Sequence, residues 1–264
     1  MAEKNVFFVT GASRGIGLEF VRVLASEEKG EKNIVVAACR NPNSAAHLQA
    51  LAAQTSNIFI IKLDIADNNS VNTLELPSSI THLDVLINNA GISLPNHPEP
   101  DYASETDVDM LATLFNTNVL GTLRVTQALL PFLTINSSKF NATPVLAKVV
   151  NISSNMGSIN NIRKFGPDMP YYTSYNTTKA GLNMLTAQFA REFTSKATTI
   201  SQQREVSFLA MCPGWVGTDL GSAGGRTAPL TPNQSVTSML QVINRLTMEQ
   251  SGSFVNNSGE TILY

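Results

Sequence analysis

The chain is poor in cysteine and histidine, and each shortage narrows what the protein can be. Its 264 residues include only two cysteines, Cys39 and Cys212, which stand far apart in apolar segments. Two reduced, buried thiols in a cytosolic protein are therefore expected, with a structural disulfide as the less favoured alternative. The three histidines are isolated, and no pair has metal-ligand spacing, so no metal site is predicted.

The chain also lacks a strong excess of positive or negative charge. The sequence has 18 Lys and Arg against 20 Asp and Glu, a formal net charge of -2. This balance gives no electrostatic reason to expect nucleic acid or an anionic membrane as a partner. No uncharged apolar run is long enough to span a bilayer, and the first strand is expected so early that no room is left for a signal peptide. We therefore predict a cytoplasmic protein.

Short apolar runs alternate with longer amphipathic stretches along nearly the whole chain. The apolar runs predict strands at 5–10, 33–39, 58–63, 83–88, 147–152, 205–211 and 261–263. The stretches between them predict helices at 15–28, 44–54, 108–133, 175–195 and 234–248. This alternation indicates an α/β fold, a Rossmann-type doubly wound parallel sheet of about seven strands covered by helices on both faces. No composition break divides it, so residues 1–264 are expected to form a single domain.

Three segments rich in Pro, Gly or Asn interrupt the alternation, at 93–106, 155–174 and 217–233. Each follows the carboxyl end of a predicted strand, the edge at which open α/β sheets bind ligands. We expect them to be the rims of one cleft. The segment 217–233 is the best candidate for a mobile substrate loop.

A glycine-rich turn follows the first predicted strand directly and opens a helix. Small residues there let the backbone approach a pyrophosphate, and the helix N-terminus supplies free N–H groups and a positive dipole end. Any tight strand-to-helix turn can use glycine, but this position in the first βαβ unit favours a dinucleotide site. The residues assigned to the cofactor here are Gly11, Ser13, Arg14, Gly15, Ile16 and Gly17.

Tyr175 and Lys179 are spaced four residues apart at the start of a predicted helix, so their side chains share one face. A free tyrosine has a pKa of about 10 and is a poor base at neutral pH. A neighbouring ammonium group and an oxidised cofactor beside it both stabilise the phenolate, and we expect the two together to lower that pKa. Such pairs also arise by chance, but this one ends an irregular cleft segment.

Several motifs together resemble one family. The glycines are spaced G-x-x-x-G-x-G, Asn88-Asn89-Ala90-Gly91 follows the fourth strand, and Tyr175-x-x-x-Lys179 opens a later helix. In this order, and over essentially the whole chain, they resemble the short-chain dehydrogenase/reductase family. The segments 152–159 and 213–220 look most like Sniffer-type carbonyl reductases and C-factor-like proteins.

The resemblance implies a nicotinamide cofactor, and the end of the second strand indicates NADP(H). Cys39 stands where an NAD enzyme carries a carboxylate for the ribose 2′-hydroxyl, and Arg40 follows it. Arg14 is the second position at which NADP-preferring members carry a base, although both arginines could be solvated surface charges. Asp64 resembles the residue that meets the adenine amino group, with a turn cap as the alternative. The other cofactor positions implied are Ile65, Asn89, Ala90, Gly91, Pro213, Gly214, Val216 and Thr218.

The catalytic residues implied by the family are Asn118, Ser154, Tyr175 and Lys179. Ser154 would stabilise the developing alkoxide, with Ser153 as the alternative. Asn118 would bind a water that links Lys179 to solvent, with Asn116 as a competitor. The stretch between Ser154 and Tyr175 is longer than usual, so 155–174 is interpreted as an insertion that forms the substrate wall.

The activity expected is NADPH-dependent reduction of a ketone, aldehyde, diketone or quinone, with Tyr175 as the proton donor. A sensor that binds NADP without turnover is the rival interpretation. A sugar-nucleotide epimerase or dehydratase needs a longer C-terminal domain, and no G-x-S-x-G elbow supports a hydrolase. A homodimer is a weak expectation.

Overall fold

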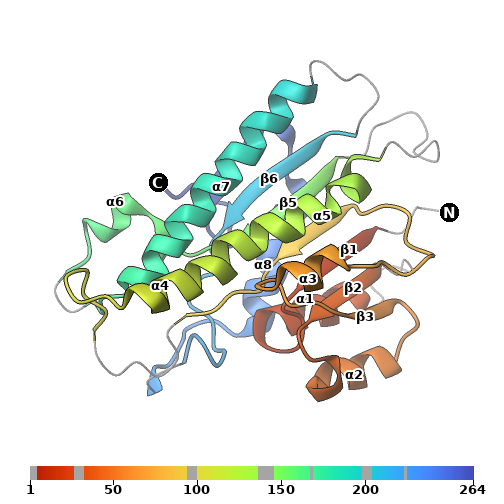
Figure 1. The fold of residues 1–264 in the computed structure, drawn as a ribbon, viewed down its shortest axis with the longest axis horizontal. Helices are drawn as coiled ribbons and strands as arrows, with labels where there is room; N and C mark the ends of the chain where they lie inside the picture. Colours follow the sequence, from red (N-terminus) through yellow and green to blue (C-terminus); the bar gives the residue numbers. More distant parts are fainter. Residues whose placement is uncertain are drawn as a thin grey trace.

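The computed structural model describes residues 5–26, 33–93, 100–135, 146–166, 169–197, 204–222 and 225–264. Residues 27–28 of the predicted first helix, and 94–99, 167–168 and 223–224 of the predicted cleft rims, lie outside the described residues. The chain forms a seven-stranded parallel sheet with helices on both faces, which confirms the predicted fold class (Figure 1). The strands are β1 (Val6–Thr10), β2 (Ile34–Cys39), β3 (Ile58–Lys62), β4 (Val85–Asn88), β5 (Ala147–Ile152), β6 (Val206–Met211) and β7 (Phe254–Val255).

The sheet changes its direction of growth between β1 and β4. Its strand order is β3-β2-β1-β4-β5-β6-β7, so the chain runs outward from β1 to β3 and then returns to the other side of β1. The loops after β1 and β4 diverge at this point, which is where ligands bind in sheets of this kind. The glycine-rich turn follows β1 and Asn89 follows β4, so the topology brings both motifs to this crevice.

The helices lie in two layers. They are α1 (Gly15–Ala25), α2 (Ala46–Ala53), α3 (Asn68–Asn72), α4 (Val108–Phe115), α5 (Thr122–Thr134), α6 (Ile159–Ile162), α7 (Thr173–Ala197) and α8 (Pro232–Arg245). Helices α1 and α8 pack on one face of the sheet, and α5 and α7 pack on the other (Figure 1).

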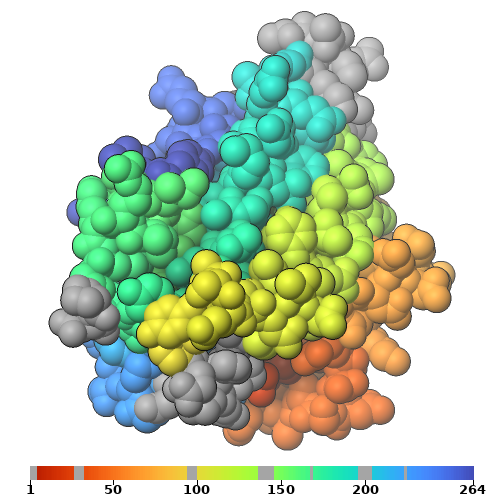
Figure 2. Space-filling view, turned by 60° about the vertical axis from the view of Figure 1, so that its left-hand side comes forward, coloured from red at the N-terminus to blue at the C-terminus, as the bar shows by residue number. Residues whose placement is uncertain are grey.

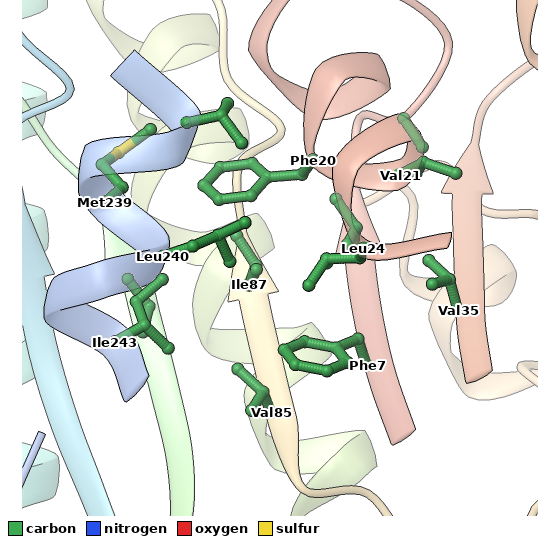
Figure 3. Packing of buried hydrophobic residues seen from close by; sticks show 14 of the residues in the cluster. Phe7, Phe20, Val21, Leu24, Val35, Val85, Ile87, Met239, Leu240 and Ile243 are labelled. Carbon is green, nitrogen blue, oxygen red and sulfur yellow. The ribbon is translucent and has the colours of Figure 1, made fainter. Parts of the chain in front are cut away.

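Alternate residues of each strand face the two layers. In β1, Phe7 and Val9 belong to the apolar cluster that includes α1 and α8, and Phe8 belongs to the cluster that includes α5 and α7. Figure 3 shows Phe20 of α1 and Met239 of α8 in the first of these clusters. This period of two is what β-structure requires of a sheet covered on both faces, and it explains why the strands are almost wholly apolar.

The prediction for the last strand was wrong. The seventh strand is β7, which pairs with β6 through Ala210 and Phe254. The predicted segment 261–263 instead folds back on β7, where Ile262 donates its N–H to the Phe254 carbonyl at 2.8 Å. A two-residue strand is too short to show an apolar pattern, so only its buried packing identifies it.

The predicted helices lie where they were expected, but one of them is interrupted and another begins earlier than predicted. The predicted helix 108–133 is α4 and α5 joined by a π-helical segment, η2 (Asn116–Gly121). Helix α7 begins two residues earlier than predicted, at Thr173. The segment 155–174 contains a short 3-10 turn, η3 (Asn155–Gly157), and α6.

Candidate active site

The loops after β1 and β4 are bonded to each other. The Thr10 hydroxyl accepts the backbone N–H groups of Asn89 and Ala90, at 3.0 and 2.9 Å. The Asn89 side chain donates to the carbonyls of Thr10 at 3.0 Å and Gly11 at 3.4 Å. Asn89, assigned to the cofactor from sequence, therefore also fixes the glycine-rich turn. Thr10 was missed, because a threonine at the end of an apolar strand carries no motif.

The turn after β1 requires glycine at three positions, through close approaches at Gly11 and Gly17 and through positive φ at Gly11 and Gly15. Gly11 and Gly15 have φ of +68° and +57°, values that favour glycine. A Cβ on Gly11 would lie 2.8 Å from the Ala90 Cα, and one on Gly17 would overlap the Gly11 carbonyl. A Cβ on Gly15 would meet the Thr218 methyl group at 3.4 Å. The turn is thus a bare backbone cradle, with Ala90 and Thr218 at its sides.

Two basic residues are close to the cradle along the chain or the sheet: Arg14 lies within the turn, and Arg40 follows β2, which pairs with β1. Arg40 is exposed just after β2. Arg14 forms an ion pair with Asp219 at 3.4 Å, with the two side chains 75% and 80% exposed. A pair so exposed contributes little stability, so an anion of higher charge can displace the carboxylate.

The contacts of Asp64, just after β3, bear on its two expected roles, a contact with adenine or a cap of the next turn. Its Oδ1 accepts the Ala66 N–H at 3.0 Å, and its own N–H donates to the Ser70 hydroxyl at 2.8 Å. Asp64 therefore makes the turn interaction that was the alternative to an adenine contact. Ile65 is buried, and its side chain would contact a Cβ on Gly121 at 2.9 Å.

The segment after β6 forms a loop closed at its base. Val216 forms an isolated bridge with Leu230, and Gly217 donates to the Leu230 carbonyl at 2.8 Å. The Ser235 hydroxyl of α8 donates to the Pro213 carbonyl at 2.6 Å, and Gly214 has a φ of +81°. These contacts hold Pro213 to Gly217 in place and define the base of the predicted substrate loop.

Tyr175, Lys179 and Ser154 come together where β5 meets the start of α7. Tyr175 is in the first turn of α7 and Lys179 is one turn later; the Lys179 Nζ lies 5.6 Å from the Tyr175 ring centroid. Nζ donates to the Ile152 carbonyl at 2.8 Å. Ser154 follows Ile152 by two residues, which places its hydroxyl near enough to Tyr175 to influence the pKa of the phenol.

The two serines after β5 have different surroundings. Ser153 is buried, and its hydroxyl donates to the Asn183 Oδ1 at 2.6 Å. Ser154 is half-buried, and its hydroxyl accepts the Met156 N–H at 3.2 Å. The geometry therefore favours Ser154 over Ser153 as the hydroxyl available beside Tyr175.

A close approach fixes Ser154 relative to α7. A Cβ on Gly157 would lie 2.7 Å from the Lys179 carbonyl carbon and 2.9 Å from the Ala180 nitrogen. Backbone thus packs on backbone between η3 and α7. Only glycine permits this, which explains the glycine three residues after Ser154.

Burial governs the direction of the Tyr175 pKa shift. Burial of the phenol raises its pKa above 10, the neighbouring Cys212 raises it further, and the hydrogen bond with Ser154 opposes this only in part. The expectation that Lys179 and a bound oxidised nicotinamide together lower this pKa stays a prediction, while burial of the phenol acts in the opposite direction. Burial also lowers the pKa of Lys179 to about 8. Tyr175 is therefore a protonated phenol at neutral pH.

Asn118 lies in η2, and its side chain joins the loop after β4 to α7. Its Oδ1 accepts the Ile92 N–H and its Nδ2 donates to the Ile92 carbonyl, both at 2.8 Å. Nδ2 also donates to the Thr178 hydroxyl at 3.0 Å. A Cβ on Gly91 would lie 3.2 Å from the Asn118 Oδ1 and 3.7 Å from the Lys179 Nζ, so both polar groups border the same residue. The amide is thus engaged with protein groups.

Asn116, the competitor, is placed elsewhere. Its Nδ2 donates to the Ala66 carbonyl at 3.2 Å, and its Oδ1 accepts from Arg124 at 2.8 Å. This contact set ties η2 to the turn after β3. The geometry favours Asn118 as the asparagine of the site.

Other expectations can be compared directly. Cys39 and Cys212 are both buried and free, so the disulfide alternative was wrong. Among the described residues, no group of three His, Cys, Asp or Glu could hold a metal ion. Within the same part of the chain, no helix is long and apolar enough to cross a membrane.

Similarity to known proteins identifies the family to which this chain belongs. The family model for short chain dehydrogenases matches residues 5–227, and the chain belongs to that family. An uncharacterised oxidoreductase of Schizosaccharomyces pombe is 32% identical over 278 residues, with 98% of each chain covered. The structure of a carbonyl reductase from chicken fatty liver, with NADPH bound, is 31% identical, covers 100% of both chains and has a TM-score of 0.82. Carbonyl reductase Sniffer of D. melanogaster is 29% identical, covers 99% of this chain and 100% of its own, and has a TM-score of 0.82. The chain is thus an oxidoreductase similar to carbonyl reductases.

Proposed function

We propose that the protein reduces a carbonyl group to an alcohol with NADPH, using Tyr175 as the proton donor. The observation that carries the proposal is the convergence of Ser154, Tyr175 and Lys179 at the end of the crevice that holds the glycine cradle. The similarity to the chicken carbonyl reductase and to Sniffer supports the same activity. Aldehydes, diketones, quinones and aromatic ketones are the proposed substrates.

The residues of the crevice fit a dinucleotide with a 2′-phosphate. The cradle at Gly11, Gly15 and Gly17 leaves backbone N–H groups open to a pyrophosphate at the start of α1. Arg14 and Arg40 can bind the extra phosphate, and Cys39 replaces the carboxylate that would repel it. When bound, NADPH supplies the hydride that reduces the carbonyl carbon. The other residues proposed to hold it are Ser13, Ile16, Asp64, Ile65, Asn89, Ala90, Gly91, Tyr175, Lys179, Pro213, Gly214, Val216 and Thr218.

The chain's own groups then manage the oxygen and its proton. The Ser154 hydroxyl orients the carbonyl oxygen and stabilises the charge that develops on it. The Tyr175 phenol gives its proton to that oxygen, and its raised pKa keeps it protonated beforehand. Lys179 stabilises the phenolate left behind. We propose that Asn118 supports the return of the proton by fixing the segment around Ile92 and Thr178 beside Lys179.

The test of this proposal is turnover. Purified protein is mixed with NADPH or NADH and a panel of ketones, aldehydes, diketones and quinones, and the loss of absorbance at 340 nm is followed. Steady oxidation of NADPH that depends on a carbonyl is expected. Tight NADPH binding with no turnover on any carbonyl would favour the sensor that only binds the dinucleotide. The expected cytoplasmic location and homodimer stay predictions.

Cofactor preference gives a separate prediction. Replacing Arg40 with Ser is expected to raise the KM for NADPH by about 10- to 100-fold, because one charge-assisted contact with the 2′-phosphate is lost. The KM for NADH should change by less than about threefold, since NADH lacks that phosphate. Initial rates with each cofactor measure both constants. Arg191→Ser, at an exposed position on α7, is the control, and an equal loss with both cofactors would contradict the assignment of Arg40.

A further inference from the structure

Asp101, which no motif singles out, is a buried carboxylate at the start of the helix that carries Tyr175. It lies in the segment between β4 and α4 and is only 5% exposed. Its Oδ2 accepts the N–H of Ser174, the residue directly before Tyr175, at 2.6 Å. Its Oδ1 accepts from the Thr106 hydroxyl at 2.8 Å. Both carboxylate oxygens are therefore directed by hydrogen bonds.

The backbone of Asp101 also binds residues 171–173, which directly precede Ser174. Its carbonyl accepts the Thr173 hydroxyl at 2.6 Å and the Thr173 N–H at 3.2 Å. Its N–H donates to the Tyr171 carbonyl at 3.0 Å, and it forms an isolated parallel bridge with Tyr172. Asp101 thus holds the last residues of the insertion and the first turn of α7 together.

This arrangement replaces an ordinary helix cap. The first N–H groups of a helix have no partner within it, and the residue just before the helix usually supplies one. The residue before α7 is Tyr172, whose hydroxyl is bonded instead to Arg226 at 2.8 Å. A carboxylate from a distant segment takes the capping position, and its negative charge is favourable at the positive end of the helix.

The segment that carries Asp101 also packs on the insertion. The rings of Tyr102 and Tyr171 lie 4.7 Å apart between centroids. In Figure 2 the yellow atoms around residue 100 lie against the green insertion and beside the teal α7. The chain reaches Tyr175 through the insertion, so its own continuity does not fix where α7 begins. The hydrogen bonds of Asp101, in the segment after β4, fix the position of the first turn of α7 instead.

Resting on the proposed role of Tyr175, we propose that Asp101 is a positioning residue for the proton donor and for the substrate wall. By binding Ser174 and Tyr171 at once, it sets the distance between the first turn of α7 and the end of the insertion. Removing its carboxylate leaves the Ser174 N–H without this partner and lets the phenol of Tyr175 shift relative to Ser154, while the backbone bonds of Asp101 to Tyr171 and Thr173 remain. A displacement of about 1 Å at a reacting group can cost about 100-fold in rate.

The test compares Asp101→Ala with Asp101→Asn. In the alanine variant we expect kcat to fall by about 100-fold, with a smaller change in KM for the carbonyl because the backbone bonds of Asp101 to the insertion remain. NADPH binding, followed by its fluorescence, should stay within about twofold of the wild type, since no hydrogen bond of Asp101 reaches the glycine cradle. The asparagine variant keeps an oxygen for Ser174 and an amide that can donate to the Thr106 hydroxyl. It should recover kcat to within about threefold of the wild type.

Asp107→Ala is the matched control. Asp107 caps α4 in the usual way, accepting the N–H groups of Asp109 at 2.9 Å and Met110 at 3.2 Å. A merely structural carboxylate at position 101 would lower the melting temperature as Asp107→Ala does and leave kcat unchanged, which would overturn the proposal. An inactive wild type would defeat the proposed function itself. An active wild type with fully active Asp101→Ala defeats only the role of Asp101.

Discussion

Replacing Tyr175 with phenylalanine is expected to reduce carbonyl reduction by at least about 1000-fold, within the range that a positioned proton donor contributes. Phenylalanine keeps the ring that packs beneath Lys179 and removes only the hydroxyl, the proposed proton donor beside Ser154. Ser154 cannot substitute for it, because a serine hydroxyl is a far weaker acid than a phenol. The fold and the affinity for NADPH should therefore be retained while kcat collapses.

The measurement is kcat at saturating NADPH, with the NADPH dissociation constant determined in parallel by fluorescence. Tyr102→Phe is the matched control, because Tyr102 is 41% exposed on the rim of the cleft and its loss of a hydroxyl should change kcat by less than about twofold. If Tyr175→Phe retained a tenth or more of the wild-type kcat, Tyr175 would not be the proton donor.

The pH dependence of kcat follows from the two shifted groups. The raised pKa of Tyr175 keeps the donor protonated throughout the neutral range. Lys179, with a pKa lowered to about 8 by burial, loses its positive charge as the pH rises above that value. The phenolate formed in the reaction is then no longer stabilised by a cation. We expect kcat for reduction to be level below about pH 7 and to fall above about pH 8.

The parts of the site that could be predicted from sequence are those that local chain geometry enforces. A tight turn after β1 needs glycine, so Gly11, Gly15 and Gly17 mark the cradle directly. One helical turn separates Tyr175 from Lys179 whatever surrounds them. Strand positions were also readable, because a sheet covered on both faces demands apolar residues at nearly every position.

The parts that could not be predicted depend on contacts between distant segments. Asp101 and Ser174 are 73 residues apart, and a side chain bonded to a distant backbone N–H leaves no periodic trace. The direction of the Tyr175 pKa shift depends on how much water the folded site excludes, which spacing along a helix does not report. Strand β7 was missed for a related reason, since two residues show no alternation and Phe254 is identified only by its burial against β6.

The amino end of the sheet, away from the site, holds a buried ion pair. The Arg204 Nη2 lies 2.6 Å from the Asp84 Oδ1, with the two side chains 1% and 6% exposed. Arg204 also donates to the Leu83 carbonyl at 2.8 Å, and the Asp84 Oδ2 accepts the Val6 N–H at 2.6 Å. The pair thus ties together the starts of β1 and β4 and the residues just before β6.

The surroundings of Asp84 favour its charged form. Burial alone would raise the pKa of Asp84, but hydrogen bonds from His82, the Val6 N–H and Arg204 outweigh it and hold the pKa below its usual value. A carboxyl group with a depressed folded-state pKa stabilises the fold above its unfolded pKa of about 3.9. That contribution is lost as the pH falls through the folded-state value.

Arg204→Met should therefore lower the free energy of unfolding at pH 7 by about 3–5 kcal/mol, because it leaves the Asp84 carboxylate buried without its cation. The double variant Asp84→Asn/Arg204→Met should recover part of this loss, since a neutral amide still accepts the Val6 N–H. The gap between Arg204→Met and the wild type should narrow below about pH 4, where Asp84 is protonated in the variant. Urea unfolding at pH 7 and pH 4 measures both effects. Arg22→Met, in a pair with Glu19 in which the arginine side chain is 50% exposed, should cost less than about 1 kcal/mol. An equal loss of stability in Arg22→Met and Arg204→Met would show that burial does not explain the contribution of the Asp84–Arg204 pair.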